Sequence, residues 1–246
     1  MILEKKTRII PTGEFVFLDG PKPRTFEFIF AFKVWKEFIK GFRTLHFIGP
    51  AITVFGGARF KPGEHYYEKA VEVGKAIAEL GFATVTGGGP GIMEAANKGA
   101  FENGGLSIGI NILLPFEQHG NPYVHKTVTI NYFFVRKTLL LKYSYAFIVM
   151  PGGFGTMDEL FETITLMQTD IVTDFPVVLI GKQYWNKLFD FMEVMNEHKT
   201  ISPEDKYLLK VTDSIDEAMD YIQKYVGDNY KVEKRNKPLW WLFEKS

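Results

Sequence analysis

Short apolar segments alternate with longer amphipathic segments along most of the chain. The short segments are continuous apolar runs that end in glycine or polar residues, which is typical of strands buried on both faces. The longer segments repeat apolar residues at helical spacing, and several end at glycine. The expected strands are 51–55, 82–86, 106–113, 127–132, 146–150, 175–180 and 207–211. The expected helices are 65–80, 92–103, 133–143, 158–171, 185–198 and 214–226, the last with Ser214 as N-cap and Glu217 completing a capping box.

Strands that alternate with helices predict a sheet covered by helices on both faces. Right-handed crossovers make this a doubly wound, Rossmann-like α/β fold with a mostly parallel sheet. We assign residues 50–226 to this nucleotide-binding catalytic domain. Residues 1–49 form an N-terminal extension with a Phe-rich amphipathic helix, expected to dock on the core or on a second subunit. Residues 227–246 form a tail whose aromatic cluster is expected to pack on the domain or on a partner subunit.

Composition narrows the class of protein. The chain has 246 residues, of which 46% are hydrophobic, and this suits one packed α/β domain. Its formal net charge is zero, which argues against general affinity for nucleic acid or membrane surfaces. It has no cysteine, which excludes disulfides, thiolate catalysis and cysteine-based metal sites. No targeting segment is recognised at the N-terminus, so a cytoplasmic location is expected.

Three glycine-rich loops follow expected strands, at 56–57, 87–91 and 152–156. The carboxyl ends of parallel strands meet at one edge of the sheet, which is where ligands bind in such folds. A glycine loop that leads into a helix offers free N–H groups and a positive dipole end, which suit a phosphate. For 56–57 alone, a simple tight turn is an equally good interpretation. At 151–156, Thr156 adds a hydroxyl at the expected helix N-cap and favours phosphate.

The common nucleotide motifs are absent. A dinucleotide fingerprint requires a third glycine where the chain has Glu94 or Asp158, and no Gly-Lys-Ser/Thr sequence is present. The bound phosphate is therefore expected to belong to a mononucleotide or a sugar phosphate.

Charged residues accompany these loops. Glu159 and Glu162 fall on one face of the helix after the third loop. Glu159 could instead close a capping box with Thr156. Arg136 and Lys137 stand near the start of an expected helix, where cations oppose the helix dipole. A neighbouring anion would offset them, either a substrate phosphate or one of the two glutamates; solvated side chains are the alternative.

The segments 87–97, 136–137 and 151–159 resemble the LOG ("Lonely Guy") family, whose hallmark is Pro-Gly-Gly-x-Gly-Thr-x-x-Glu. Members are phosphoribohydrolases that release the base from nucleoside 5′-monophosphates, and they were long labelled as possible lysine decarboxylases. The resemblance extends from about 52 to 211. The stretches 117–118 and 121–124 are typical of a longer bacterial branch.

The resemblance implies roles for individual residues. Arg136 and Glu159 match the catalytic pair of the family. The residues that match its phosphate-binding loop are Gly152, Gly153, Gly155 and Thr156. The other residues implied in substrate binding are Gly88, Gly89, Lys137 and Glu162, with Glu162 beside the ribose.

The resemblance also implies a mechanism that needs no metal or cofactor. Glu159 would stabilise the oxocarbenium-like ribose and orient or deprotonate water, while Arg136 holds the nucleotide and Glu159 in register. The five histidines show no spacing typical of metal ligands: His46, His65, His119, His125 and His198.

Two departures from plant-type members affect the base. Phe134 replaces a histidine two residues before the catalytic arginine, and 55–58 reads Phe-Gly-Gly-Ala instead of Cys-Gly-Ser-Ser. AMP is therefore as plausible a substrate as a cytokinin nucleotide.

Three alternatives remain at this point: a nucleotide-sensing module, a pyridoxal-phosphate decarboxylase, and a molybdenum-cofactor carrier on the same fold. The retained Arg136 and Glu159 favour catalysis. The resemblance further implies a homodimer or larger homo-oligomer, with a small nucleotide and neither nucleic acid nor membrane as its partner.

Overall fold

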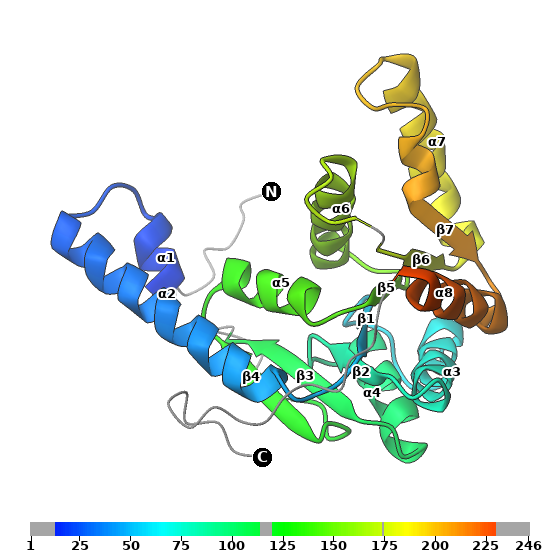
Figure 1. Ribbon diagram of the computed structural model, residues 1–246, viewed down its shortest axis with the longest axis horizontal. Helices are drawn as coiled ribbons and strands as arrows, with labels where there is room; N and C mark the ends of the chain where they lie inside the picture. Colours follow the sequence, from blue (N-terminus) through cyan, green and yellow to red (C-terminus); the bar gives the residue numbers. More distant parts are fainter. Residues whose placement is uncertain (1–12, 114–119, 174, 230–246) are drawn as a thin grey trace, which may run out of the picture.

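The computed structural model describes residues 13–113, 120–173 and 175–229. Its seven strands form one sheet in which every neighbouring pair is parallel, in the order β4-β3-β2-β1-β5-β6-β7 (Figure 1). The strands are β1 (Ala51–Phe55), β2 (Ala83–Thr86), β3 (Ser107–Ile112), β4 (Lys126–Ile130), β5 (Ala146–Val149), β6 (Val177–Ile180) and β7 (Leu209–Thr212). The predicted doubly wound α/β fold is confirmed.

Helices cover both faces of this sheet (Figure 1). They are α1 (Gly13–Leu18), α2 (Arg24–Leu45), α3 (His65–Glu79), α4 (Ile92–Glu102), α5 (Phe133–Lys142), α6 (Phe154–Gln168), α7 (Lys182–Glu197) and α8 (Ile215–Asn229), with a 3₁₀ turn at Asp205–Leu208. Helices α3, α4 and α8 enclose one core, and α2, α5, α6 and α7 enclose the other. Strand residues alternate between the two cores, because successive side chains point to opposite faces.

Most elements lie within a few residues of their predicted bounds. Some local predictions at helix starts are wrong. Helix α6 begins at Phe154 rather than at 158. The capping box of α8 is only half formed: Ser214 Oγ accepts the N–H of Glu217 at 3.2 Å, but the Glu217 carboxylate binds Lys210 and Thr212. Because the Glu217 carboxylate binds these two side chains, it does not accept the backbone N–H of Ser214 as a full capping box requires.

Helices α3 and α4 approach so closely that glycine is required at their contact. A Cβ on Gly74 would lie 2.0 Å from the carbonyl oxygen of Ala96, and a Cβ on Gly99 would lie 1.9 Å from that of Val71. Both obstacles are backbone atoms, so a side chain at either position would separate the helices.

We therefore expect Gly99→Leu to lower the free energy of unfolding by about 1–3 kcal/mol or more, because overpacking forces backbone shifts. Urea unfolding followed by circular dichroism measures this. Gly227→Ala is the matched control, since Gly227 lies in α8 with nothing within 4 Å of an added Cβ. Equal unfolding midpoints for the two variants would contradict the proposed helix contact.

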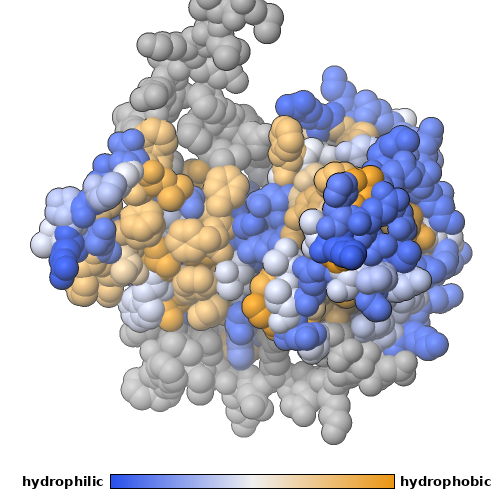
Figure 2. All heavy atoms as spheres, turned by 90° about the horizontal axis from the view of Figure 1, so that it is seen from above, coloured by the Kyte–Doolittle hydropathy of each residue, from blue (hydrophilic) through white to orange (hydrophobic). Residues whose placement is uncertain are grey.

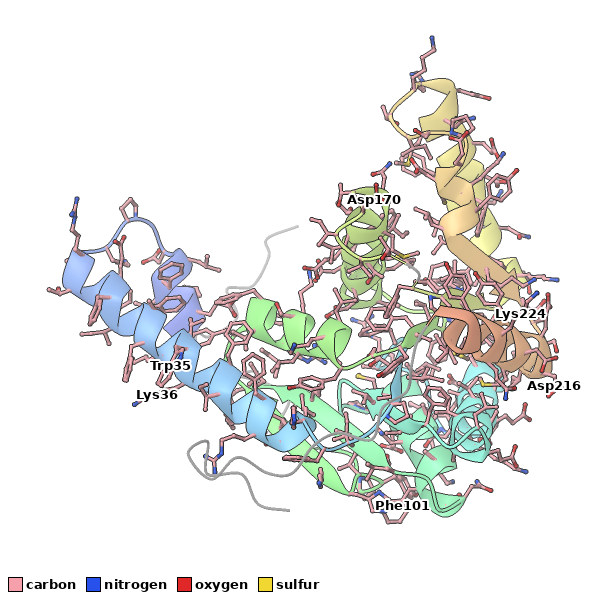
Figure 3. The ribbon with its side chains drawn as sticks, viewed as in Figure 1. Trp35, Lys36, Phe101, Asp170, Asp216 and Lys224 are labelled. Atoms are coloured by element: carbon pink, nitrogen blue, oxygen red, sulfur yellow. The ribbon has the colours of Figure 1, made fainter. Side chains whose placement is uncertain are left out.

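The N-terminal extension contains the predicted long helix, α2, together with the short helix α1, which the sequence analysis did not predict. Phe30, Gly41 and Leu45 of α2 are buried toward the core. The opposite side leaves Phe28 and Trp35 exposed by 77% and 55%. Apolar residues gather over the α1–α2 end of the molecule (Figure 2), and Trp35 and Lys36 point away from α5 (Figure 3). The predicted contact of the aromatic tail lies outside the described residues.

Within the described ranges, no helix combines the length and the apolar character that crossing a membrane requires.

Candidate active site

A cavity of about 840 Å³ lies at the carboxyl ends of β1, β2 and β5. Strands β1 and β5 are neighbours in the sheet, and the order in which strands are added changes direction between them. Doubly wound sheets bind ligands at such switch points. The lining residues are Phe55, Gly56, Gly57, Ala58, Arg59, Phe60, Gly87, Met93, Arg136, Gly152, Gly153, Phe154, Gly155, Thr156, Met157, Glu159 and Tyr184.

The three glycine-rich loops meet at this cavity, as predicted, and Gly57 connects them. Its N–H donates to the carbonyl oxygen of Pro151 at 2.9 Å, and its own carbonyl oxygen accepts the N–H of Ile92 at 3.0 Å. Gly91 has a φ of +70°, and a Cβ there would lie 2.4 Å from Gly57 O. These loops can pack backbone against backbone only because glycine occupies the contact positions.

Helix α6 begins within the third loop. Gly153 is its N-cap in extended conformation, and the N–H groups of Thr156 and Met157 both donate to Gly153 O. Thr156 is therefore inside the first turn and is not the N-cap, which corrects our expectation. Glu159 lies in the second turn, so the capping-box interpretation of Glu159 is also wrong. The first turn of a helix leaves N–H groups without intrahelical acceptors, and here that turn lines the cavity.

Two side chains fix the shape of the third loop. Thr156 packs over Gly152, where a Cβ would lie 2.1 Å from its Oγ1. Tyr184, at the start of α7, donates its hydroxyl proton to Gly152 O at 2.5 Å. Both contacts fix the loop at Gly152, and the backbone of Gly152, Gly153 and Gly155 lines the cavity.

Arg136 extends from α5 into the cavity and is held by backbone. Its Nε donates to the carbonyl oxygen of Ile110 at 2.7 Å. Its guanidinium lies against Gly87, where a Cβ would be 2.1 Å from Nη2. Burial lowers the pKa of Arg136 below its ordinary value, and the neighbouring Glu159 charge opposes that shift. An arginine stays protonated in proteins, so it supplies a fixed positive charge beside Glu159.

Glu159 is a buried carboxylate, only 8% exposed. Burial raises its pKa to about 7, while the positive charges of Arg136 and Lys137 act in the opposite direction. The nearby carboxylates Glu162 and Asp158 raise it further. A carboxyl group with a pKa near neutrality is suited to exchange protons with a substrate or with water.

Lys137 joins α5 to α6 through two ion pairs. Its Nζ lies 3.0 Å from Asp158 Oδ1 and 2.7 Å from Glu162 Oε2. Neither Lys137 nor Glu162 is among the residues that line the cavity. Glu162, one of the two glutamates predicted to lie near these cations, thus pairs with Lys137. Asp158 is a second anion at Lys137, which the sequence did not indicate.

Of the second glycine loop, only Gly87 lines the cavity. Gly88 and Gly89 follow it in the chain and are not among the lining residues. The N–H of Gly88 donates to Thr86 Oγ1 at 2.9 Å, and Gly88 O accepts the N–H of Asn121 at 3.2 Å. Gly89 O accepts the side-chain amide of Asn121 at 3.4 Å, so both glycines connect the loop to a polar network.

Several lining residues were not predicted. Arg59 follows the first glycine loop directly, so its place in the chain could have indicated it. Met93 stands two residues after the second glycine loop, so its place in the chain gives a similar indication. Tyr184 carries no such signal, because it reaches the cavity only through the packing of α7.

The pKa of Glu159 has a measurable consequence. If ionised Glu159 is the active form, kcat/KM should rise with pH through about 7. The reason is that lowering the pH protonates the carboxylate and removes its negative charge. A profile of the catalytic rate from about pH 5 to about pH 9 tests this. A rate that falls as the pH rises through neutrality would show instead that the protonated form is active.

Comparison with known proteins shows what this chain is similar to. The family model described as "Possible lysine decarboxylase" matches residues 93–222. A cytokinin riboside 5′-monophosphate phosphoribohydrolase of Arabidopsis thaliana (LOG1) is 32% identical over 188 residues, which cover 75% of this chain and 87% of that relative. The chain belongs to the LOG family. A probable cytokinin riboside 5′-monophosphate phosphoribohydrolase of Oryza sativa subsp. japonica (LOGL6) is 30% identical to this LOG-family protein, over 79% of the chain and 77% of the relative.

Solved structures support the fold. The molybdenum cofactor binding protein of Rippkaea orientalis has a TM-score of 0.56 at 23% identity and covers 72% of this chain and 98% of its own. The molybdenum cofactor carrier protein of Chlamydomonas reinhardtii has a TM-score of 0.56 at 24% identity and covers 73% and 99%. At these identities the likeness concerns the fold alone.

Proposed function

We propose that this LOG-family protein hydrolyses the N-glycosidic bond of nucleoside 5′-monophosphates and releases free base and ribose 5-phosphate. The observation that carries the proposal is the half-buried Arg136 and the buried Glu159 in the same cavity as the first turn of α6. The phosphoribohydrolase names of its relatives support the same reaction class.

The 5′-phosphate binds in this proposal at the third loop. Free N–H groups at a helix start and the positive end of the helix dipole favour a phosphate. Gly152, Gly153 and Gly155 present backbone there, and the Thr156 hydroxyl is close by. Binding energy from the phosphate would hold the scissile bond against Glu159, although the phosphate does not itself react.

The reaction breaks the bond between C1′ and the base nitrogen. The electron pair leaves with the base, and C1′ gains oxocarbenium character that the Glu159 carboxylate stabilises. Water adds to C1′ and gives one proton to Glu159. The departing base takes up one proton from solvent and Glu159 returns the proton that it received from water, so the carboxylate is regenerated and the products are free base and ribose 5-phosphate. Arg136 keeps its proton and holds Glu159 and the nucleotide in register.

Lys137 and Glu162 enter this proposal as an ion pair that holds α5 against α6. Gly88 and Gly89 shape the loop that presents Gly87 to the guanidinium of Arg136. These four residues support the arrangement of the nucleotide site from outside the cavity lining.

The preferred base is tested with a panel of nucleoside 5′-monophosphates and isopentenyladenosine 5′-monophosphate, with free base measured by chromatography. We expect adenine from AMP at a rate at least equal to that of the prenylated base, because Phe55 to Ala58 replace the plant-type first loop. Base mainly from the prenylated substrate would support the cytokinin activity named for the relatives. Tight AMP binding with no base from any nucleotide would favour the nucleotide-sensing alternative.

We also propose that the protein self-associates. The exposed residues Phe28, Ile29, Phe32 and Trp35 form an apolar row on α2 that a second copy would cover. Analytical ultracentrifugation tests this, and a monomer at all concentrations would contradict it.

A further inference from the structure

Helix α5, which carries Arg136, has a start that its own sequence does not stabilise. Its N-cap, Tyr132, makes no side-chain capping hydrogen bond, and its first turn contains no acidic residue. Arg136 and Lys137 follow as the fourth and fifth residues of the helix, where positive charge opposes the dipole. The helix start therefore needs acceptors and negative charge from elsewhere in the chain.

The N-terminal helices supply both. Glu14 of α1 accepts the N–H of Phe133, the first residue of α5, at 3.0 Å. Glu37 of α2 accepts the backbone N–H of Asn131 at 3.2 Å with one carboxylate oxygen, and the side-chain amide of Asn131 with the other. Two carboxylates that lie far away in the sequence thus meet the segment that leads into α5.

Further contacts hold the same two segments together. Lys40 donates to the carbonyl oxygen of Thr129, two residues before Asn131. The ring of Phe30 packs edge-on against Tyr132 at a centroid distance of 5.0 Å and is stacked on Phe17 of α1 at 3.8 Å. Residues 129–133 are therefore fixed at successive points by α1 and α2.

The position of Arg136 depends on this start. Its N–H donates to Tyr132 O at 3.1 Å, and its side chain reaches Ile110 O and the cavity from the first turn of α5. We propose that helices α1 and α2 are a working part of the active site, in which Glu14 and Glu37 are positioning residues that fix the first turn of α5 and thereby Arg136. The inference rests on the proposed function, because its main readout is base release.

The test uses the full chain with Glu14→Ala, Glu37→Ala and the double variant. A misplacement of about 1 Å can cost about 100-fold in rate, so we expect kcat of the double variant to fall about 10- to 100-fold. The acid limb of its pH profile should move to higher pH, because a displaced Arg136 no longer lowers the pKa of Glu159. A purely structural loss of folded protein would lower the rate without moving the profile.

Glu27→Ala is the matched control, since this glutamate of α2 is exposed and its carboxylate has no hydrogen bond or ion pair with other described residues. It should leave kcat and the pH profile unchanged. Glu37→Gln should retain more activity than Glu37→Ala, because a flipped Asn131 amide can complete both hydrogen bonds with glutamine. Variants that retain the kcat and pH profile of Glu27→Ala would overturn the inference.

A second readout separates this inference from the proposed function. The Arg136 Nε–H, which is bonded to Ile110 O, can be followed by nitrogen-15 NMR in arginine-labelled protein. We expect it to exchange with water at least about 10-fold faster in the double variant than in Glu27→Ala, because the helix start is released. If the wild-type protein releases no base, the proposed function fails and this resonance alone decides. Unchanged exchange would then overturn the positioning role.

Discussion

Glu159→Gln is expected to reduce the rate of base release by about 10²–10⁴-fold, the usual contribution of a positioned acid or base. Glutamine has nearly the same shape, but it can neither take a proton from water nor offer a negative charge to the oxocarbenium-like ribose. The carboxylate is buried beside Arg136, with a pKa raised to about 7, so no solvent group replaces it. AMP should still bind, because the phosphate loop is untouched. Steady-state kinetics and calorimetric titration with AMP measure the two effects.

Asp158→Asn is the matched control for this variant. Asp158 is adjacent to Glu159 in α6, but it is ion-paired with Lys137 and is absent from the cavity lining. The control should retain most of the wild-type rate. Normal turnover by Glu159→Gln, or an equal loss in Asp158→Asn, would contradict the role of Glu159.

Arg136→Met is expected to lower kcat/KM by about 10²–10³-fold, similar to the loss of one preorganised electrostatic contact in other enzymes. Methionine fills much of the same volume but makes no hydrogen bond to Ile110 O and carries no charge. Without the guanidinium, the pKa of Glu159 should rise above about 7, since Arg136 now acts to lower it. The acid limb of the pH profile should therefore move to higher pH. Kinetics across the pH range measure both changes.

Arg136→Lys separates charge from geometry. It restores a positive charge, but an ammonium cannot reproduce the planar fork that contacts Ile110 O and lies against Gly87. We expect it to recover part of the shift in the pH profile but little of the lost rate. Full activity in either variant would show that Arg136 has no part in the reaction.

The fold could be predicted largely because buried parallel strands have a simple sequence pattern. Strand β1 was predicted to the residue, since its apolar run 51–55 ends at two glycines. The meeting of the three glycine loops followed in turn, because the carboxyl ends of parallel strands share one edge of the sheet. Arg136 and Glu159, singled out by motif and charge, lie together in the cavity at that edge.

What could not be predicted depends on tertiary contacts. The start of α6 was placed too late, because glycines 153 and 155 suggested a loop, whereas Gly153 is the N-cap and Gly155 lies within the helix. The sequence predicts the anions near Arg136 and Lys137 in the substrate or in α6. Glu14 and Glu37 also accept N–H groups at the start of α5, from Phe133 and Asn131. Each glutamate lies more than ninety residues from its partner in the sequence. The spacing of residues within a segment cannot predict contacts between residues that are so far apart in the sequence.

The most direct test of the central claim is to incubate the purified protein with AMP in phosphate-free buffer and measure both products by chromatography. We expect adenine and ribose 5-phosphate in equal amounts, with neither formed by Glu159→Gln on the same timescale. AMP that binds but remains intact would contradict the proposed hydrolysis. Cleavage that requires added phosphate would contradict it as well, because water would then not be the attacking group.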